Sequence, residues 1–108
     1  MYVYVVDDPK GIQLELRDAD NFVQFQISID RNLDRCRADA ALQAIGRVDG
    51  EGHAWLDQQA IVKLSGGRSG DPVWQRSFAA MVDYATSKGW VDETGAIRAH
   101  IERDEGEQ

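Results

Sequence analysis

The 108-residue sequence has a single cysteine, Cys36, and only two histidines, His53 and His100. One cysteine cannot form an internal disulfide or supply a paired-cysteine metal motif. Two histidines so far apart in the chain match no metal-ligand spacing, so we expect no metal and no cofactor. No segment approaches the roughly 20 apolar residues that a membrane span needs. The first ten residues also lack the features of a signal peptide, and we predict a cytoplasmic protein without membrane contact.

Basic residues are in the minority, because 12 lysines and arginines face 19 aspartates and glutamates, for a net charge of -7. Such a field repels phosphate backbones, and we expect no nucleic-acid binding. The same field favours a protein partner with a basic surface. A small-molecule ligand is the alternative, and the sequence leaves open whether the chain forms a homodimer.

Length and composition, with 43% hydrophobic residues, predict one globular α+β domain over residues 1–102. Residues 103–108 are expected to form a flexible acidic tail. The first third of the chain alternates between apolar and polar residues, which is typical of half-buried strands. It predicts an antiparallel three-stranded meander over residues 2–6, 11–18 and 21–29, with Val23 and Phe25 among the residues facing the core.

Two interpretations compete in the next segment. Helical spacing over residues 31–45 predicts a helix with Asp30 as its N-cap, Cys36 on its packed face and Gly46 after its end. Alternatively, residues 42–48 form a strand that pairs through a glycine-containing turn with residues 53–56.

The second half of the chain predicts two further helices. One begins after Asp57, and a longer one begins at Asp71 and ends at Gly89, with Phe78 on its apolar face. A loop is expected between the two helices, and a hairpin joins residues 90–91 to 96–102. The prediction is thus an antiparallel sheet with about three helices on one face.

From residue 31 to residue 102 the expected order is helix, short strand, helix, helix and hairpin, which is similar to that of a winged-helix domain. The long helix, however, carries only Arg76 and Lys88 against Asp83, whereas DNA binding would favour a basic face. The similarity of order therefore predicts no DNA-binding role.

Candidate site residues come from the two segments that contain histidine. His53 and Trp55 share one face of their strand, while Arg98, His100 and Glu102 share the polar face of the last strand. If the two strands pair, the histidines approach each other. We expect an exposed His53 to have a pKa of about 6.5, the ordinary value for histidine.

Two functional hypotheses follow from these residues. The first is a small binding or regulatory protein, similar in kind to immunity proteins or antitoxins, which uses Trp55, Trp90, Arg98 and Glu102 for binding. The alternative is a small cofactor-free isomerase, lyase or hydrolase with a pocket between sheet and helices. Its catalytic candidates are His53 or His100 as general base, with Asp57 or Glu102 orienting the imidazole. A helix N-cap is the favoured role of Asp57, because aspartate is among the best N-caps.

Overall fold

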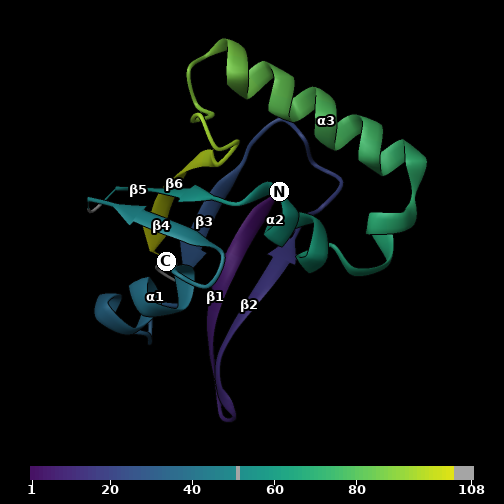
Figure 1. Ribbon diagram of the computed structural model, residues 1–108. Helices are drawn as coiled ribbons and strands as arrows, with labels where there is room; N and C mark the ends of the chain where they lie inside the picture. The colour runs from purple at the N-terminus through teal and green to yellow at the C-terminus, as the bar shows by residue number, and fades with distance from the viewer. Residues whose placement is uncertain (51, 104–108) are drawn as a thin grey trace.

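The computed structural model describes residues 1–50 and 52–103, which form an α+β domain with a curled six-stranded sheet and three α-helices (Figure 1). In chain order the strands are β1 (Tyr2–Asp8), β2 (Gly11–Arg17), β3 (Gln26–Ile29), β4 (Gly46–Asp49), β5 (His53–Leu56) and β6 (Ile97–Arg103). The helices are α1 (Arg35–Leu42), α2 (Gln58–Leu64), the 3-10 helix η1 (Gly66–Gly70) and α3 (Pro72–Ser87). In the described part of the chain, no helix combines the length and the apolar character needed to cross a bilayer.

The sheet is mixed, with the strand order β2-β1-β3-β6-β5-β4, so the predicted antiparallel meander is wrong beyond its first hairpin. β1 pairs antiparallel with β2 but parallel with β3, and β3 pairs parallel with β6. Tyr2 pairs with Arg17 on one side and with Gln26 on the other, so the chain between β2 and β3 must cross the start of β1. The Met1 ammonium group donates hydrogen bonds to carbonyl oxygens of this crossing loop, at Asn21 (2.8 Å) and Gln24 (3.0 Å).

The crossing loop, residues 18–25, also corrects the predicted strand 21–29, because regular pairing begins only at residue 26. Val23, expected in the core, is 90% exposed. Trp74 on α3 donates from Nε1 to the Ala19 carbonyl oxygen at 2.8 Å, and its ring lies 6.0 Å from that of Phe22. The loop is therefore held by the start of β1 and by α3.

Each interpretation of the segment after β3 is right in part. α1 begins after Asp34, whose carboxylate accepts from the backbone N–H of Arg37 at 2.8 Å, so the N-cap is not Asp30. The chain then extends into β4, which pairs with β5 as the alternative predicted. Cys36 is exposed rather than packed, because α1 turns Ala38 and Leu42 toward the core.

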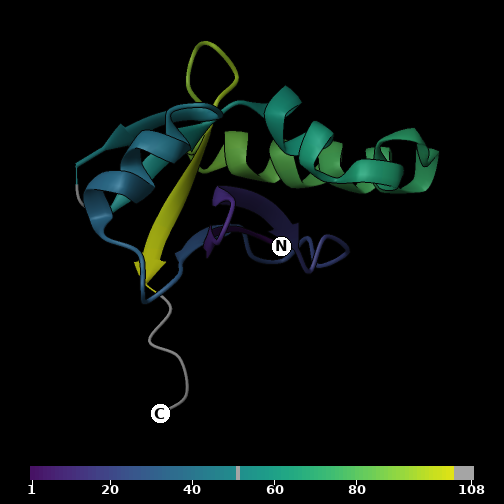
Figure 2. The same cartoon turned by 90° about the horizontal axis from the view of Figure 1, so that it is seen from below.

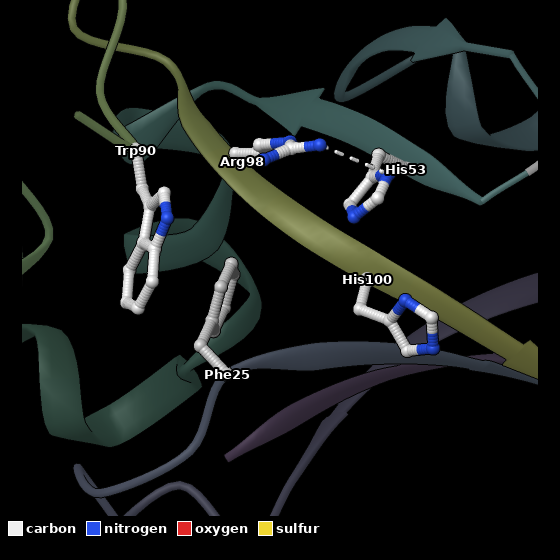
Figure 3. Close-up of a pocket in the computed structure, with 5 residues that line it drawn as sticks. All are labelled: Phe25, His53, Trp90, Arg98 and His100. Carbon is white, nitrogen blue, oxygen red and sulfur yellow. Dashed lines mark hydrogen bonds between the residues drawn. The ribbon is translucent and has the colours of Figure 1, made fainter. Parts of the chain in front are cut away.

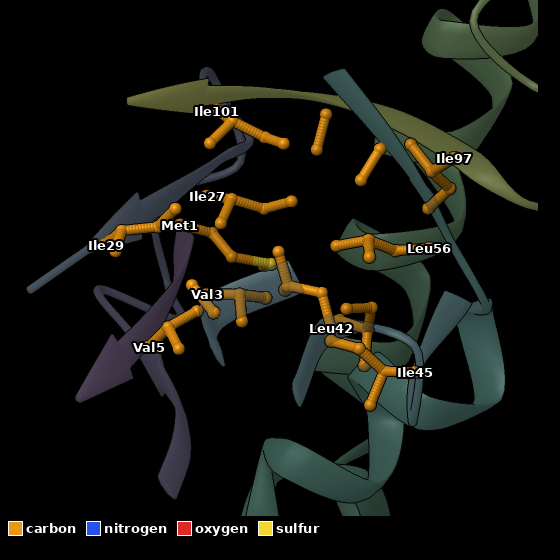
Figure 4. Packing of buried hydrophobic residues seen from close by; sticks show 14 of the residues in the cluster. Met1, Val3, Val5, Ile27, Ile29, Leu42, Ile45, Leu56, Ile97 and Ile101 are labelled. Carbon is orange, nitrogen blue, oxygen red and sulfur yellow. The ribbon is translucent and has the colours of Figure 1, made fainter. Parts of the chain in front are cut away.

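The core lies on the inner face of the sheet and takes residues from all three helices. Ile97, Ala99 and Ile101 of β6 face inward, as the alternation predicted. α1 contributes Leu42 and α2 contributes Ile61. The close view in Figure 4 shows side chains from β1, β3, β5 and β6 converging with Leu42. The outer face of the sheet therefore carries the alternate residues of the same strands.

α3 has the predicted ends, with Asp71 as N-cap, Pro72 in its first turn and Gly89 at a φ of 79° beyond its C-cap. The segment before it forms η1 instead of the expected loop. The predicted C-terminal hairpin is reduced to one bridge between Val91 and Ile97, and the remainder of β6 joins the large sheet. With β4 added and β6 next to β3, residues 31–102 do not have the winged-helix order.

The helices occupy different parts of the molecule, as Figures 1 and 2 show, with α1 beside β4 at one end and α3 at the other. β6 runs one residue further than the expected domain boundary, to Arg103, which pairs with Ile29. The rest of the predicted acidic tail lies outside the described residues.

Candidate functional site

The register of the sheet aligns one outward-facing residue from every strand into a row. Each paired residue shares a face with its neighbour, and Tyr2, His53 and His100 alternate with buried positions in their own strands. In sheet order, the row consists of Arg17, Tyr2, Gln26, His100, His53 and Asp49.

The two histidines lie directly opposite each other on β5 and β6, as the predicted strand pairing required. Their ring centroids are 5.5 Å apart, with an edge-to-face angle of 64°. Arg98, two residues before His100, places Nη2 at 3.3 Å from Nδ1 of His53. Because a guanidinium can only donate, Nδ1 accepts this bond and the proton of a neutral His53 is on Nε2.

The pKa of His53 is lowered from its ordinary value, in contrast to the expectation for an exposed histidine. Desolvation is the largest cause, followed by the positive charges of Arg98 and of His100. His53 is therefore neutral at pH 7, and an anion near these groups would raise its pKa.

A hollow of about 280 Å³ opens at these groups and is lined by Phe25, His53, Trp90, Arg98 and His100. Figure 3 shows the Trp90 and Phe25 rings on one side of the hollow and the two imidazoles on the other. Trp90 and Arg98 were predicted binding residues. Phe25 was not identified from the sequence as a site residue, because the alternation of apolar and polar residues placed its side chain on the core-facing side of a predicted strand. The site thus combines aromatic walls with a cationic edge.

Arg98 has no carboxylate partner within residues 1–50 and 52–103; its side chain contacts the neutral His53. Other arginines do form ion pairs, for example Arg17 with Glu15, Arg35 with Asp39, Arg37 with Asp7, Arg47 with Asp92, and Arg68 with Asp20. The guanidinium of Arg98 therefore retains donors for an external anion.

Glu102 lies beside the hollow without lining it. Its Oε1 is 3.5 Å from Nε2 of His100, so the structure brings together these two predicted site residues. A carboxylate at this distance can orient the imidazole.

Trp55 belongs to a separate hollow of about 310 Å³, whose lining also includes Arg47 and Asp57. The Trp55 Nε1 donates to Asp49 at 3.0 Å, and the Arg47 guanidinium lies 5.3 Å from the centre of its ring. Arg47 is also bonded to Asp92, at 2.8 Å. The pKa of Asp92 is lowered, first by the hydrogen bond from Thr94, and burial opposes the shift. The polar groups around Trp55 thus bind one another within the fold.

Asp57 is the N-cap of α2, as predicted. Its carboxylate accepts from the backbone N–H of Gln59 at 3.3 Å. It follows the end of β5, whereas His53 begins that strand, and it does not line the hollow at His53. The structure therefore does not bring Asp57 to the histidine it was suggested to orient.

Substitutions of Asp57 test whether its role is to cap α2 or to take part in catalysis. We expect Asp57→Asn and Asp57→Ser to leave stability nearly unchanged, because both side chains can still accept the helix N–H bond. Asp57→Ala should lower the free energy of unfolding by about 1 kcal/mol, measured by urea denaturation. If Asp57→Asn proved as damaging as Asp57→Ala, the charge itself would matter and the cap would not be the full explanation.

Among the described residues, no group of three or more histidine, cysteine, aspartate or glutamate side chains is placed to hold a metal ion. Comparison with known proteins gives no match to a family model, a curated protein or a solved structure. The geometry around Arg98 is therefore the basis for inferring function.

Proposed function

We propose that this protein is a small binding protein that recognises a carboxylate group of its partner in the hollow at Arg98. The observation that carries the proposal is the arginine without a carboxylate partner, set between aromatic rings and imidazoles. Arginine binds carboxylates through two parallel hydrogen bonds, which fixes orientation and adds binding energy. Tryptophan and arginine are also the residues most enriched at the energetic centres of protein interfaces.

The electrostatic field of the net charge of -7 acts at longer range than the contacts in the hollow. It favours approach of a partner with a basic surface, and the hollow then receives a carboxylate from that surface. Association should consequently slow as salt is added, since screening weakens steering between exposed charges. A protein partner and a cytoplasmic location remain parts of this proposal.

Phenylacetate is a suitable probe because it joins a carboxylate to one aromatic ring, and phenylacetamide is its neutral control of the same shape. In an NMR titration of the full chain, we expect phenylacetate to shift the amide signals of Phe25, His53 and Arg98. The pKa of His53 should rise on binding, and binding should strengthen as pH falls through that pKa, because the protonated imidazole adds a second cation.

Arg98→Gln should weaken phenylacetate binding by about ten-fold or more, as expected for loss of a charge-assisted hydrogen bond. Arg76→Gln removes the same charge from the exposed side of α3 and should have little effect. Equal binding of phenylacetate and phenylacetamide, or equal effects of the two variants, would contradict carboxylate recognition.

Catalysis is the second candidate, and the contact between Glu102 and His100 is the observation that favours it. A carboxylate-oriented imidazole beside an aromatic hollow could act as a general base. Hydrolysis of p-nitrophenyl acetate provides a test, with free imidazole as the reference rate. If the protein only binds, the rate of p-nitrophenyl acetate hydrolysis should not depend on Glu102. A hydrolysis rate that is orders of magnitude lower in Glu102→Gln than in the wild type would favour the enzyme.

A further inference from the structure

The hollow at Arg98 continues into an apolar groove along α3. A hollow of about 480 Å³ is lined by Phe22, Val23, Ser77, Ala80, Met81 and Tyr84. A smaller hollow of about 80 Å³ shares Phe22, Val23, Met81 and Tyr84 with it, and Phe25, Trp90 and Arg98 with the hollow at His53. We call these three adjoining hollows the docking groove.

The docking groove has one wall from α3 and one from the crossing loop. Ser77, Ala80, Met81 and Tyr84 recur at helical spacing, on a face next to the one that buries Phe78. The opposite wall, which includes Val23, is held by the bonds from Met1 and Trp74 to the loop backbone. Both walls are therefore in place before any partner binds.

Exposed large apolar side chains gather along this groove. Val23 is 90%, Tyr84 58% and Trp90 40% exposed. The rings of Tyr84 and Trp90 lie 6.2 Å apart, at 70°, which connects the apolar end to the cationic end. Contiguous apolar surface bordered by charge is typical of an interaction site.

We propose that the segment docking here is a short peptide of the partner in which two or three apolar side chains are followed by a carboxylate. This inference rests on the proposed function and adds the sequence character of the ligand. Charge complementarity supports this choice. The wide apolar end has no charged lining residue, whereas the other end is lined by Arg98 together with the imidazoles of His53 and His100. The carboxylate comes from an acidic side chain or from a chain terminus, since the guanidinium recognises the same group in both.

Selection of a random 12-residue phage-displayed library on the full chain tests the inference without a known partner. We expect enrichment of sequences with clustered apolar residues and a nearby aspartate or glutamate. Synthetic copies of an enriched peptide, with a free or an amidated C-terminus, then distinguish the two sources of carboxylate by calorimetry. Enrichment of basic sequences, or of none, would overturn the inference, whereas the phenylacetate titration tests the proposed function independently.

Point variants locate the peptide in the groove. Val23→Ser should weaken binding by about three- to ten-fold, in line with the apolar area lost. Val73 is also exposed, at 61%, but lies outside the groove, so Val73→Ser is the matched control and should bind as the wild type does.

The variants also distinguish failure of this inference from failure of the proposed function. If Arg98→Gln abolishes binding while Val23→Ser and Tyr84→Ala do not affect it, the apolar docking is wrong and carboxylate recognition stands. If none of the three weakens binding, both are wrong. Sedimentation could instead show a stable dimer that Val23→Ser dissociates. That result would assign the groove to a second copy of the chain and overturn the proposal that a partner peptide docks there.

Discussion

Replacing Phe78 by alanine should lower the free energy of unfolding by about 3–5 kcal/mol, the range for deletion of a buried aromatic ring. Phe78 is 6% exposed, and its ring stacks on Trp74 at a centroid distance of 5.1 Å and an angle of 9°. Alanine favours the helix more than phenylalanine does, so the loss must come from packing. Urea denaturation of the variant and the wild type measures the difference.

Tyr84→Ala is the matched control on the same helix, because it also removes an aromatic ring but from a residue that is 58% exposed. Its cost should stay near 0.5 kcal/mol, about the limit for substitutions at the surface. If the two variants were equally stable, the face of α3 that carries Phe78 would not be part of the core. The result also shows whether Tyr84→Ala is folded well enough for the binding experiments.

The long helix could be predicted from sequence because its signals are local. Asp71 and Pro72 define its start within two residues, Gly89 defines its end, and the apolar face repeats within each turn. The cap at Asp57 belongs to the same class of signal. These features depend on neighbouring residues and not on which strands are paired.

The parallel placement of β3 could not be predicted in this way. Apolar alternation specifies which side chains face the core, but it does not specify the neighbouring strand. That choice depends on the crossing loop, which is held by Met1 and by Trp74 from distant parts of the chain. The alternation also continues through Val23 and Phe25, so it predicted a strand where the chain forms a loop.

The candidate site was predictable to the extent that it depends on strand faces. The alternation in β5 and β6 was enough to bring His53 and His100 together once the strands paired. Phe25 and the groove beside α3 were not predictable, because they need the loop to meet the helix. Whether Arg98 has a carboxylate partner likewise depends on where the fold places the carboxylates, which the sequence does not show.

The hairpin that carries His53 depends on a glycine for a steric reason. A Cβ added to Gly46 would lie 2.0 Å from the carbonyl oxygen of Trp55 and 2.9 Å from Cα of Leu56. Both atoms belong to the backbone of β5, so no side-chain rotation relieves the contact. β4 would have to move away from β5 at the pair that Gly46 forms with Leu56.

Gly46→Ala should therefore destabilise the protein by at least about 1–3 kcal/mol, the usual cost of overpacking. The sign is informative, because replacing glycine by alanine within a strand would otherwise gain about 0.5–1 kcal/mol. Gly52→Ala, at the other end of the hairpin, is the control, since a Cβ there meets nothing within 4 Å. Thermal unfolding of both variants measures stability, and the phenylacetate titration reports whether His53 and Arg98 keep their geometry. A Gly46→Ala protein as stable as the wild type would show that β4 and β5 do not approach this closely.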